Sequence, residues 1–444
     1  MRHCSVLESF LCLSCIVSLS SADIIVPGAD GSDGPLNCGT LAGLSPDWPC
    51  GVACPNTAAV TYTIDLSQSI PRTWDTPSPV QGRGVYDFQK WAIVLKYTCV
   101  DIPSNVTIKF KNHPSRAPVV WLVSGDVRIA GTINLNGEPG TSGASTFAEP
   151  GPGGFRGGSQ WLSESSPHSA GLGPGGGPFC QEYPAYAVQY GNRMATCPEA
   201  ETYGNRAIVP LIGGSGGVYL GGAPGGAGGG AILIASETTI ALSGLISALG
   251  GSSGLIGTGG AIRLVADVVR DAPPPSTPGR LRAGPDVQGR IRIEANTRQL
   301  ADPGSPQYTV SAAGTQAFLW PEDTAPTVQI KTIGAQTAPT DPRASLDIPG
   351  ADITVPNQGS QLVVIEAGNV PLDWAVVVRM VPRQGPDITA QAAFIGGDEA
   401  LSTWHATLPL PAGFSVLQAR AYKQTSATAN GEDEVDIESP TLEK

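Results

Sequence analysis

Five arginines lie within 30 residues of one another, in a part of the chain that is rich in short β-branched runs. A guanidinium group forms two parallel hydrogen bonds with a carboxylate or sulfate, so a column of arginines can bind an acidic polysaccharide. The other interpretation, which the sequence favours, is that Glu294, Asp267 and Asp271 neutralise them in ordinary surface pairs. The candidate ligand-binding arginines are Arg263, Arg280, Arg282, Arg290 and Arg292.

Aromatic residues in a glycine-rich stretch form a second candidate site. Their rings have apolar faces that can stack on sugar rings, and Trp161 and Tyr186 are the candidates for this contact. The sequence favours the alternative that these rings pack the stretch against the rest of the protein.

Acidic residues and histidines do not follow a catalytic pattern. Glycosidases use paired carboxylates about 5 to 9.5 Å apart, and lyases use a basic side chain near calcium-binding acids. The expected strands of the repeats carry only Asp126, Asp267 and Glu294, which are far apart in sequence. We therefore expect no metal site and no cofactor, and we lean against an enzyme. A polysaccharide lyase or glycoside hydrolase is the alternative.

Composition excludes a largely helical protein and disfavours one partner class. The 444 residues include 57 Gly and 40 Pro, which break helices, while 41% hydrophobic residues are enough for a core. A net charge of −12 disfavours a nucleic-acid partner, which requires a concentrated positive field. An extracellular polysaccharide or a cell-surface component fits better, and the oligomeric state stays open.

The first 22 residues have the pattern of a secretory signal peptide, with Arg2 before an apolar run and small residues at the end. The run from Phe10 to Leu19 is too short to span a bilayer. We expect cleavage before Asp23 and a secreted or surface-exposed protein.

Six cysteines follow the leader, and an even number in an exported chain predicts disulfides. Two of them lie alone in one glycine-rich insertion and are expected to pair with each other, which leaves three possible connectivities for the other four. A zinc site at the first C-x-x-x-C pair is the disfavoured rival, because no histidine lies near. The six are Cys38, Cys50, Cys54, Cys99, Cys180 and Cys197.

A repeat with a spacing near 30 residues is the most informative feature. The segment from Gly229 to Ala235 recurs from Gly259 to Val265, with a degenerate third copy from Gly289. Alternating β-branched runs between glycine corners predict coils of a right-handed parallel β-helix. Alternation places Ile262 and Leu264 inside, and it places Arg263 and Arg292 in one outward column.

Elements outside the repeat have other patterns. A glycine-rich insertion interrupts the predicted β-helix and is predicted to be a long loop region. About eight short alternating strands near the C-terminus predict an immunoglobulin-like β-sandwich without its cysteines. The fold class is therefore all-β. The expected units are a signal peptide (1–22), an N-terminal β cap (23–116), a β-helix (117–300) with the insertion (138–228), a linker (301–325), a sandwich (326–429) and an acidic tail (430–444).

Several stretches carry a resemblance. Besides the leader, these are Asp30 to Gly34, Asn112 to Pro114 running into the strand up to Leu122, and the Gly-Gly-Ala-Ile coils. With these the chain, over roughly residues 23–430, resembles a group of secreted bacterial glycine-rich β-helix proteins without an assigned activity. It is distantly similar to the parallel β-helices of adhesins and polysaccharide lyases. The resemblance implies a fold and export, and no chemistry.

The sequence as a whole predicts a secreted, non-enzymatic surface or extracellular-matrix protein with an adhesive or structural role. The alternative is a polysaccharide-binding or polysaccharide-degrading β-helix protein.

Overall fold

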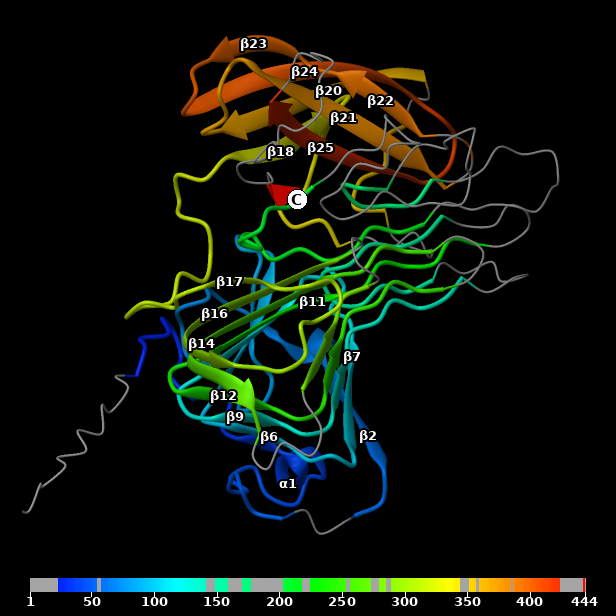
Figure 1. Cartoon of the computed structure of the whole chain (residues 1–444). Coiled ribbons are helices and arrows are strands. Elements are labelled where there is room, and N and C mark those ends of the chain that lie inside the picture. Colours follow the sequence, from blue (N-terminus) through cyan, green and yellow to red (C-terminus); the bar gives the residue numbers. More distant parts are fainter. Residues whose placement is uncertain are drawn as a thin grey trace, which may run out of the picture.

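The computed structural model describes residues 23–53, 57–140, 148–158, 170–176, 203–217, 224–252, 256–272, 279–284, 289–343, 351–356, 359–383, 385, 387–423 and 442–443. Within them the chain is almost entirely β-structure (Figure 1), as the composition predicts. The helical segments described are α1 (Cys38–Leu41) and a 3-10 turn at Leu66–Gln68. No helix among these residues is long and apolar enough to cross a membrane. The predicted leader and most of the predicted tail lie outside the described residues.

Successive turns of the chain each pass through three strand positions. The first turn is β5 (Ala92–Tyr97), β6 (Val100–Ile102) and β7 (Val106–Lys111), and the second is β8 (Val119–Val123), β9 (Val127–Ile129) and β10 (Thr132–Asn134). The third is β11 (Ala231–Ser236), β12 (Thr239–Leu242) and β13 (Leu245–Ser247). In the fourth, β14 (Ala261–Asp271) covers two positions before β15 (Arg280–Arg282), and β16 (Arg290–Gln299) follows.

Equivalent strands of these turns pair in parallel. A twelve-stranded sheet contains the first two positions, with β1 (Leu36–Asn37), β3 (Ile70–Pro71), β4 (Val85–Asp87) and β17 (Thr309–Ser311) added at its ends. β4 pairs antiparallel with β5. The third position forms a five-stranded parallel sheet in the order β15-β13-β10-β7-β2, where β2 is Val60–Asp65. The repeat thus produces two curled parallel sheets.

The prediction that Ile262 and Leu264 lie inside is confirmed. Ile262 pairs with Ile232 on one side and Ile291 on the other, and Leu264 is likewise flanked by Ile234 and Ile293. All of these side chains are buried in one core. They stack because strand alternation sends every second residue inward and the glycine corners hold the register from turn to turn.

The expected boundary between cap and solenoid does not coincide with a break in the sheets. β5, β6 and β7 already pair in parallel with β8, β9 and β10. Residues 92–111 thus form a full turn, and only the segment before them lies at the end of the stack, where β1 pairs with β6.

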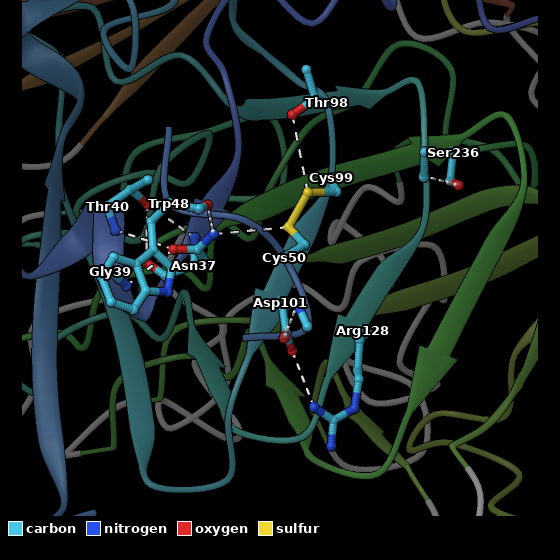
Figure 2. The surroundings of a disulfide bond; sticks show 12 residues. Asn37, Gly39, Thr40, Trp48, Cys50, Thr98, Cys99, Asp101, Arg128 and Ser236 are labelled. Atoms are coloured by element: carbon cyan, nitrogen blue, oxygen red, sulfur yellow. Dashed lines mark hydrogen bonds and ion pairs between the residues drawn. A yellow bond between two sulfur atoms is a disulfide. The ribbon is translucent and has the colours of Figure 1, made fainter. Parts of the chain in front are cut away.

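A disulfide links two segments of the chain at that end of the stack (Figure 2). Cys50 is bonded to Cys99, which lies between β5 and β6. Asn37 caps α1 through its side-chain oxygen and donates to the carbonyl of Trp48, two residues before Cys50. The zinc interpretation of Cys50 is therefore wrong. Cys38 is also in a disulfide, and Cys54, Cys180 and Cys197 lie outside the described residues.

The glycine-rich insertion was expected to be a long loop region; its described segments contain no α-helix or β-strand and pack into a bundle. Gly213 donates to the carbonyl of Gly153 (2.8 Å), Gly214 to Gly229 (2.8 Å) and Gly216 to Leu172 (2.9 Å). Gly217, three residues after Gly214, donates to Gly226 of the segment that contains Gly229 (2.9 Å), a spacing expected for an extended helix with three residues per turn rather than for a flat strand. The main chains pack so closely that a Cβ at Gly214 or Gly216 would overlap a carbonyl oxygen of the adjoining segment.

The C-terminal strands form two further sheets, drawn at the top of Figure 1. β19 (Gln336–Thr337), β18 (Thr327–Ile333), β20 (Gly359–Gly368), β24 (Leu401–Leu410) and β23 (Ala393–Gly397) follow one another in antiparallel order, and β26 (Leu442–Glu443) pairs parallel with β18. The other sheet, also antiparallel, contains β22 (Ile388–Gln391), β21 (Trp374–Pro382) and β25 (Ser415–Lys423). Both sheets share one apolar core.

An arginine joins this C-terminal part to the glycine bundle. Arg379 of β21 is 5% exposed and donates to the carbonyls of Gly171 (3.2 Å) and Gly173 (3.3 Å). Its Nε also donates to Asp387 at 2.7 Å. Because bundle carbonyls accept these bonds, the two parts pack directly against each other.

Candidate functional site

One face of the five-stranded parallel sheet is lined with polar side chains. Alternate residues of its strands, among them Ile108, Ile133, Ile246 and Leu281, are buried in the core. The residues between them point the other way, so they form two rows across the strands. We call these rows the outer polar face. They are Thr61, Thr107, Thr132, Leu245 and Arg280, and Thr63, Lys109, Asn134, Ser247 and Arg282.

The pairing fixes the spacing along each row. Thr107 is paired with Thr61 on one side and Thr132 on the other, and Leu245 with Arg280. Parallel strands lie about 4.8 Å apart, so five strands give a row roughly 19 Å long. Hydroxyl, amide and cationic groups therefore lie at the interstrand spacing on exposed or half-exposed positions, except on β13, where Leu245 is apolar and Ser247 is buried and donates to Asn136 at 2.7 Å.

Two cations of this region are neutralised by carboxylates. Lys111 pairs with Asp65 at 2.8 Å. Arg282 donates two hydrogen bonds to the carboxylate of Asp302, at 2.8 and 3.1 Å. These bonds from Arg282, helped by the charge of Arg280, lower the pKa of Asp302 against the opposing effect of its partial burial.

Two other cations of the face have no such partner. Lys109 and Arg280 are both exposed, and among the described residues neither forms an ion pair. The outer polar face thus carries surplus positive charge on a chain whose net charge is −12.

The predicted arginines divide between this face and the other sheet. Arg280 and Arg282 lie on the outer polar face. Arg263 and Arg292 are paired in register, as predicted, but Arg263 is 1% exposed. Its Nε donates to Glu294 at 2.9 Å, its Nη1 to the carbonyl of Leu319 at 3.1 Å and its Nη2 to that of Phe318.

Arg292 takes part in the same network. It donates to Glu294 at 2.8 Å and to Ser311 at 2.9 Å. Arg290 is half-buried at the start of β16, with its Nη2 3.5 Å from the carbonyl of Tyr203. The five arginines are therefore not one open ladder, because the segment through Phe318 covers its centre. Trp161 and Tyr186 lie outside the described residues.

Sequence reasoning missed the threonines and Lys109 of the outer polar face. The signal was the alternation Val-Thr-Tyr-Thr-Ile at Val60 to Ile64, and Val-Thr-Ile-Lys-Phe at Val106 to Phe110. Each run reads as a strand with one apolar and one polar side. That the two runs lie side by side depends on the pairing of β2 with β7, which the sequence between them does not reveal.

A second polar cluster lies where the stacked turns meet residues 341–343. Tyr86 donates its hydroxyl to Asp341 at 2.7 Å, and its ring lies 4.2 Å from that of His113. His113 Nδ1 is 2.8 Å from the hydroxyl of Ser115 and accepts the Ser115 backbone N–H at 3.1 Å. Burial, together with Arg343, lowers the pKa of His113 to about 4. The neutral ring thus closes a turn.

Metal ligands do not gather in the described residues: they contain no group of three or more His, Cys, Asp or Glu side chains placed to hold an ion. Comparison of the chain with known proteins finds no matching family model, no similar curated protein and no similar solved structure.

Proposed function

We propose that this protein is a secreted, non-enzymatic protein of the cell surface or extracellular matrix, with an adhesive or structural role. The pattern of a signal peptide in residues 1–22 and the disulfide between Cys50 and Cys99 support export. A disulfide of this kind persists in an oxidising compartment.

The proposed architecture is a right-handed parallel β-helix followed by an immunoglobulin-like sandwich. Three strand positions per turn, with parallel pairing between equivalent strands, support the helix. Right-handed crossovers between parallel strands are the strong preference of L-residues. Two sheets that share the core around Val363 and Val376 support the sandwich. Such a scaffold is stiff because every turn contacts its neighbours.

The outer polar face is the observation that carries the adhesive role. Its rows of Thr61, Thr107 and Thr132, and of Lys109 and Asn134, offer hydrogen-bonding groups at the interstrand spacing. An open sheet surface can hold an extended polymer along its length. It does not surround a single bond with catalytic groups on opposite sides, as hydrolysis requires.

The alternative is a protein that degrades polysaccharides. The contact between Ser115 and His113 Nδ1, beside the hydroxyl of Tyr86, is the observation that favours it. A neutral imidazole beside a tyrosine hydroxyl can take up and return a proton, which is the chemistry that the lyase form of this alternative requires. Against it, Ser115 Oγ also accepts the backbone N–H of Ala117 at 3.3 Å, within the same turn.

Light-scattering chromatography separates the two functions. The mature chain, residues 23–444, is incubated with a panel of neutral and acidic polysaccharides. We expect protein to elute with at least one polymer whose length is unchanged. Shortening of a polymer would establish an enzyme, and a Ser115→Ala variant would then test the Ser115–His113 pair. Elution apart from every polymer would contradict the adhesive role.

A further inference from the structure

We propose that the outer polar face binds a linear anionic polysaccharide, laid across the strands from β2 to β15. This inference rests on the proposed adhesive function and names its ligand. A polymer in this direction lies parallel to the two rows. It meets a new strand about every 4.8 Å, so contacts are repeated along its length.

The groups in the rows match sugar hydroxyls. Threonine hydroxyls both donate and accept hydrogen bonds, and the asparagine amide does so with separate atoms. Thr61 and Thr63 are exposed, and Thr107, Thr132 and Asn134 are half-exposed. Each is held on a paired strand, so little main-chain freedom is lost when a polymer binds.

Lys109 and Arg280, which form no ion pair among the described residues, favour acidic sugars over neutral ones. Lys109 on β7 and Arg280 on β15 are three strands apart, about 14 Å across the sheet, and are offset by two residues, about 7 Å, along the strands. Carboxylates or sulfates repeated along a polymer can reach both at once. Arg280 can bind such a carboxylate or sulfate with two parallel hydrogen bonds.

The net charge of −12 opposes polyanions at long range. At physiological ionic strength charges are screened beyond about 8 Å, so the cations on the face dominate for a polymer already in contact. A nucleic acid fits less well, because its affinity depends on many phosphate contacts and the described part of this face offers two cations outside ion pairs.

The test compares dextran sulfate and polygalacturonate with neutral dextran, using the mature chain and isothermal calorimetry at physiological salt. One variant carries Lys109→Glu with Arg280→Glu. Its control carries Arg72→Glu with Lys423→Glu, which makes the same charge change at two exposed positions away from the face. Circular dichroism confirms that each variant folds. A Lys109→Gln with Arg280→Gln pair removes the cations without adding repulsion.

We expect both anionic polymers to bind more tightly than neutral dextran. The Lys109→Glu, Arg280→Glu variant should lose at least about tenfold in affinity, the glutamine variant less, and the control should bind like the wild type. Equal loss in the control would mean that only net charge matters, and would overturn the assignment. So would unchanged binding by both face variants.

The outcomes also separate this inference from the adhesive function itself. If the wild type binds neutral polymers as well as anionic ones, the ligand assignment fails while adhesion stands. If polymers are shortened, the adhesive, non-enzymatic function fails first.

Discussion

At the scale of single residues, Arg263 shows why alternation does not by itself predict exposure. Its position between Ile262 and Leu264 places it on the side of the strand opposite the core, as expected. On that side the segment through Phe318 and Leu319 covers it, and their carbonyls accept its guanidinium hydrogens. Glu294 supplies the compensating charge.

Replacing Arg263 by alanine should therefore destabilise the fold. The carbonyls of Phe318 and Leu319 lose a buried donor, which costs about 1–3 kcal/mol, while Arg292 still pairs with Glu294. Urea unfolding measures the change. Arg83→Ala is the control, since Arg83 is exposed, and a change within about 0.5 kcal/mol is expected there. Equal stability of the Arg263 variant would show that the covering segment does not depend on it.

His113 should make stability depend on pH. Its pKa is about 4 in the folded chain against 6.5 for the free side chain, so the unfolded state binds more protons between these values. The free energy of unfolding should then fall as the pH is lowered from about 7.5 to about 5, with His113 contributing about 2 kcal/mol.

A His113→Asn variant should lose that contribution, measured by urea unfolding at both pH values. His405→Asn is the matched control, because His405 lies half-exposed on β24. If the two variants respond to pH alike, His113 is not the cause.

At the scale of elements, the glycine bundle is held by main-chain packing. Gly228 donates to the carbonyl of Phe155 at 2.9 Å, and a Cβ on Gly228 would overlap the carbonyl of Gly214. Only glycine allows main chains to approach this closely. The high glycine content of the insertion is thus a packing requirement.

Gly228→Ala should cost more than about 2 kcal/mol, because the added methyl group has to push apart two backbone segments. The control is Gly396→Ala on β23, where a Cβ meets no atom within 4 Å. Thermal unfolding of the two variants makes the comparison. Equal melting temperatures would contradict the close packing of the bundle.

At the scale of the whole molecule, the sequence predicts where strands form, but outside the repeat it does not predict which segments lie side by side. The all-β class, the stacked isoleucines and the main C-terminal strands follow from alternation and from a repeat of fixed length, so they are readable from the chain. The bundle is not, because glycine has no side chain to record which segment lies beside it. Nor can the sequence predict the segment that covers Arg263, because Phe318 and Leu319 bind the guanidinium through their backbone carbonyls and not through their side chains.

The candidate site was only partly predictable for the same reason. Arg280 and Arg282 were identified from residue type, and the structure places them on the outer polar face. Thr61 and Lys109 became part of it only through the pairing of β2, β7 and β10.

Lysine footprinting tests the central claim most directly. The chain from residue 23 onward is acetylated briefly with and without saturating dextran sulfate, and modification of each lysine is read by mass spectrometry. Lys109 should be protected by the polymer, while Lys423, which is exposed on β25, should react equally in both samples. Equal modification of Lys109 with bound polymer would place the polymer elsewhere and contradict the account.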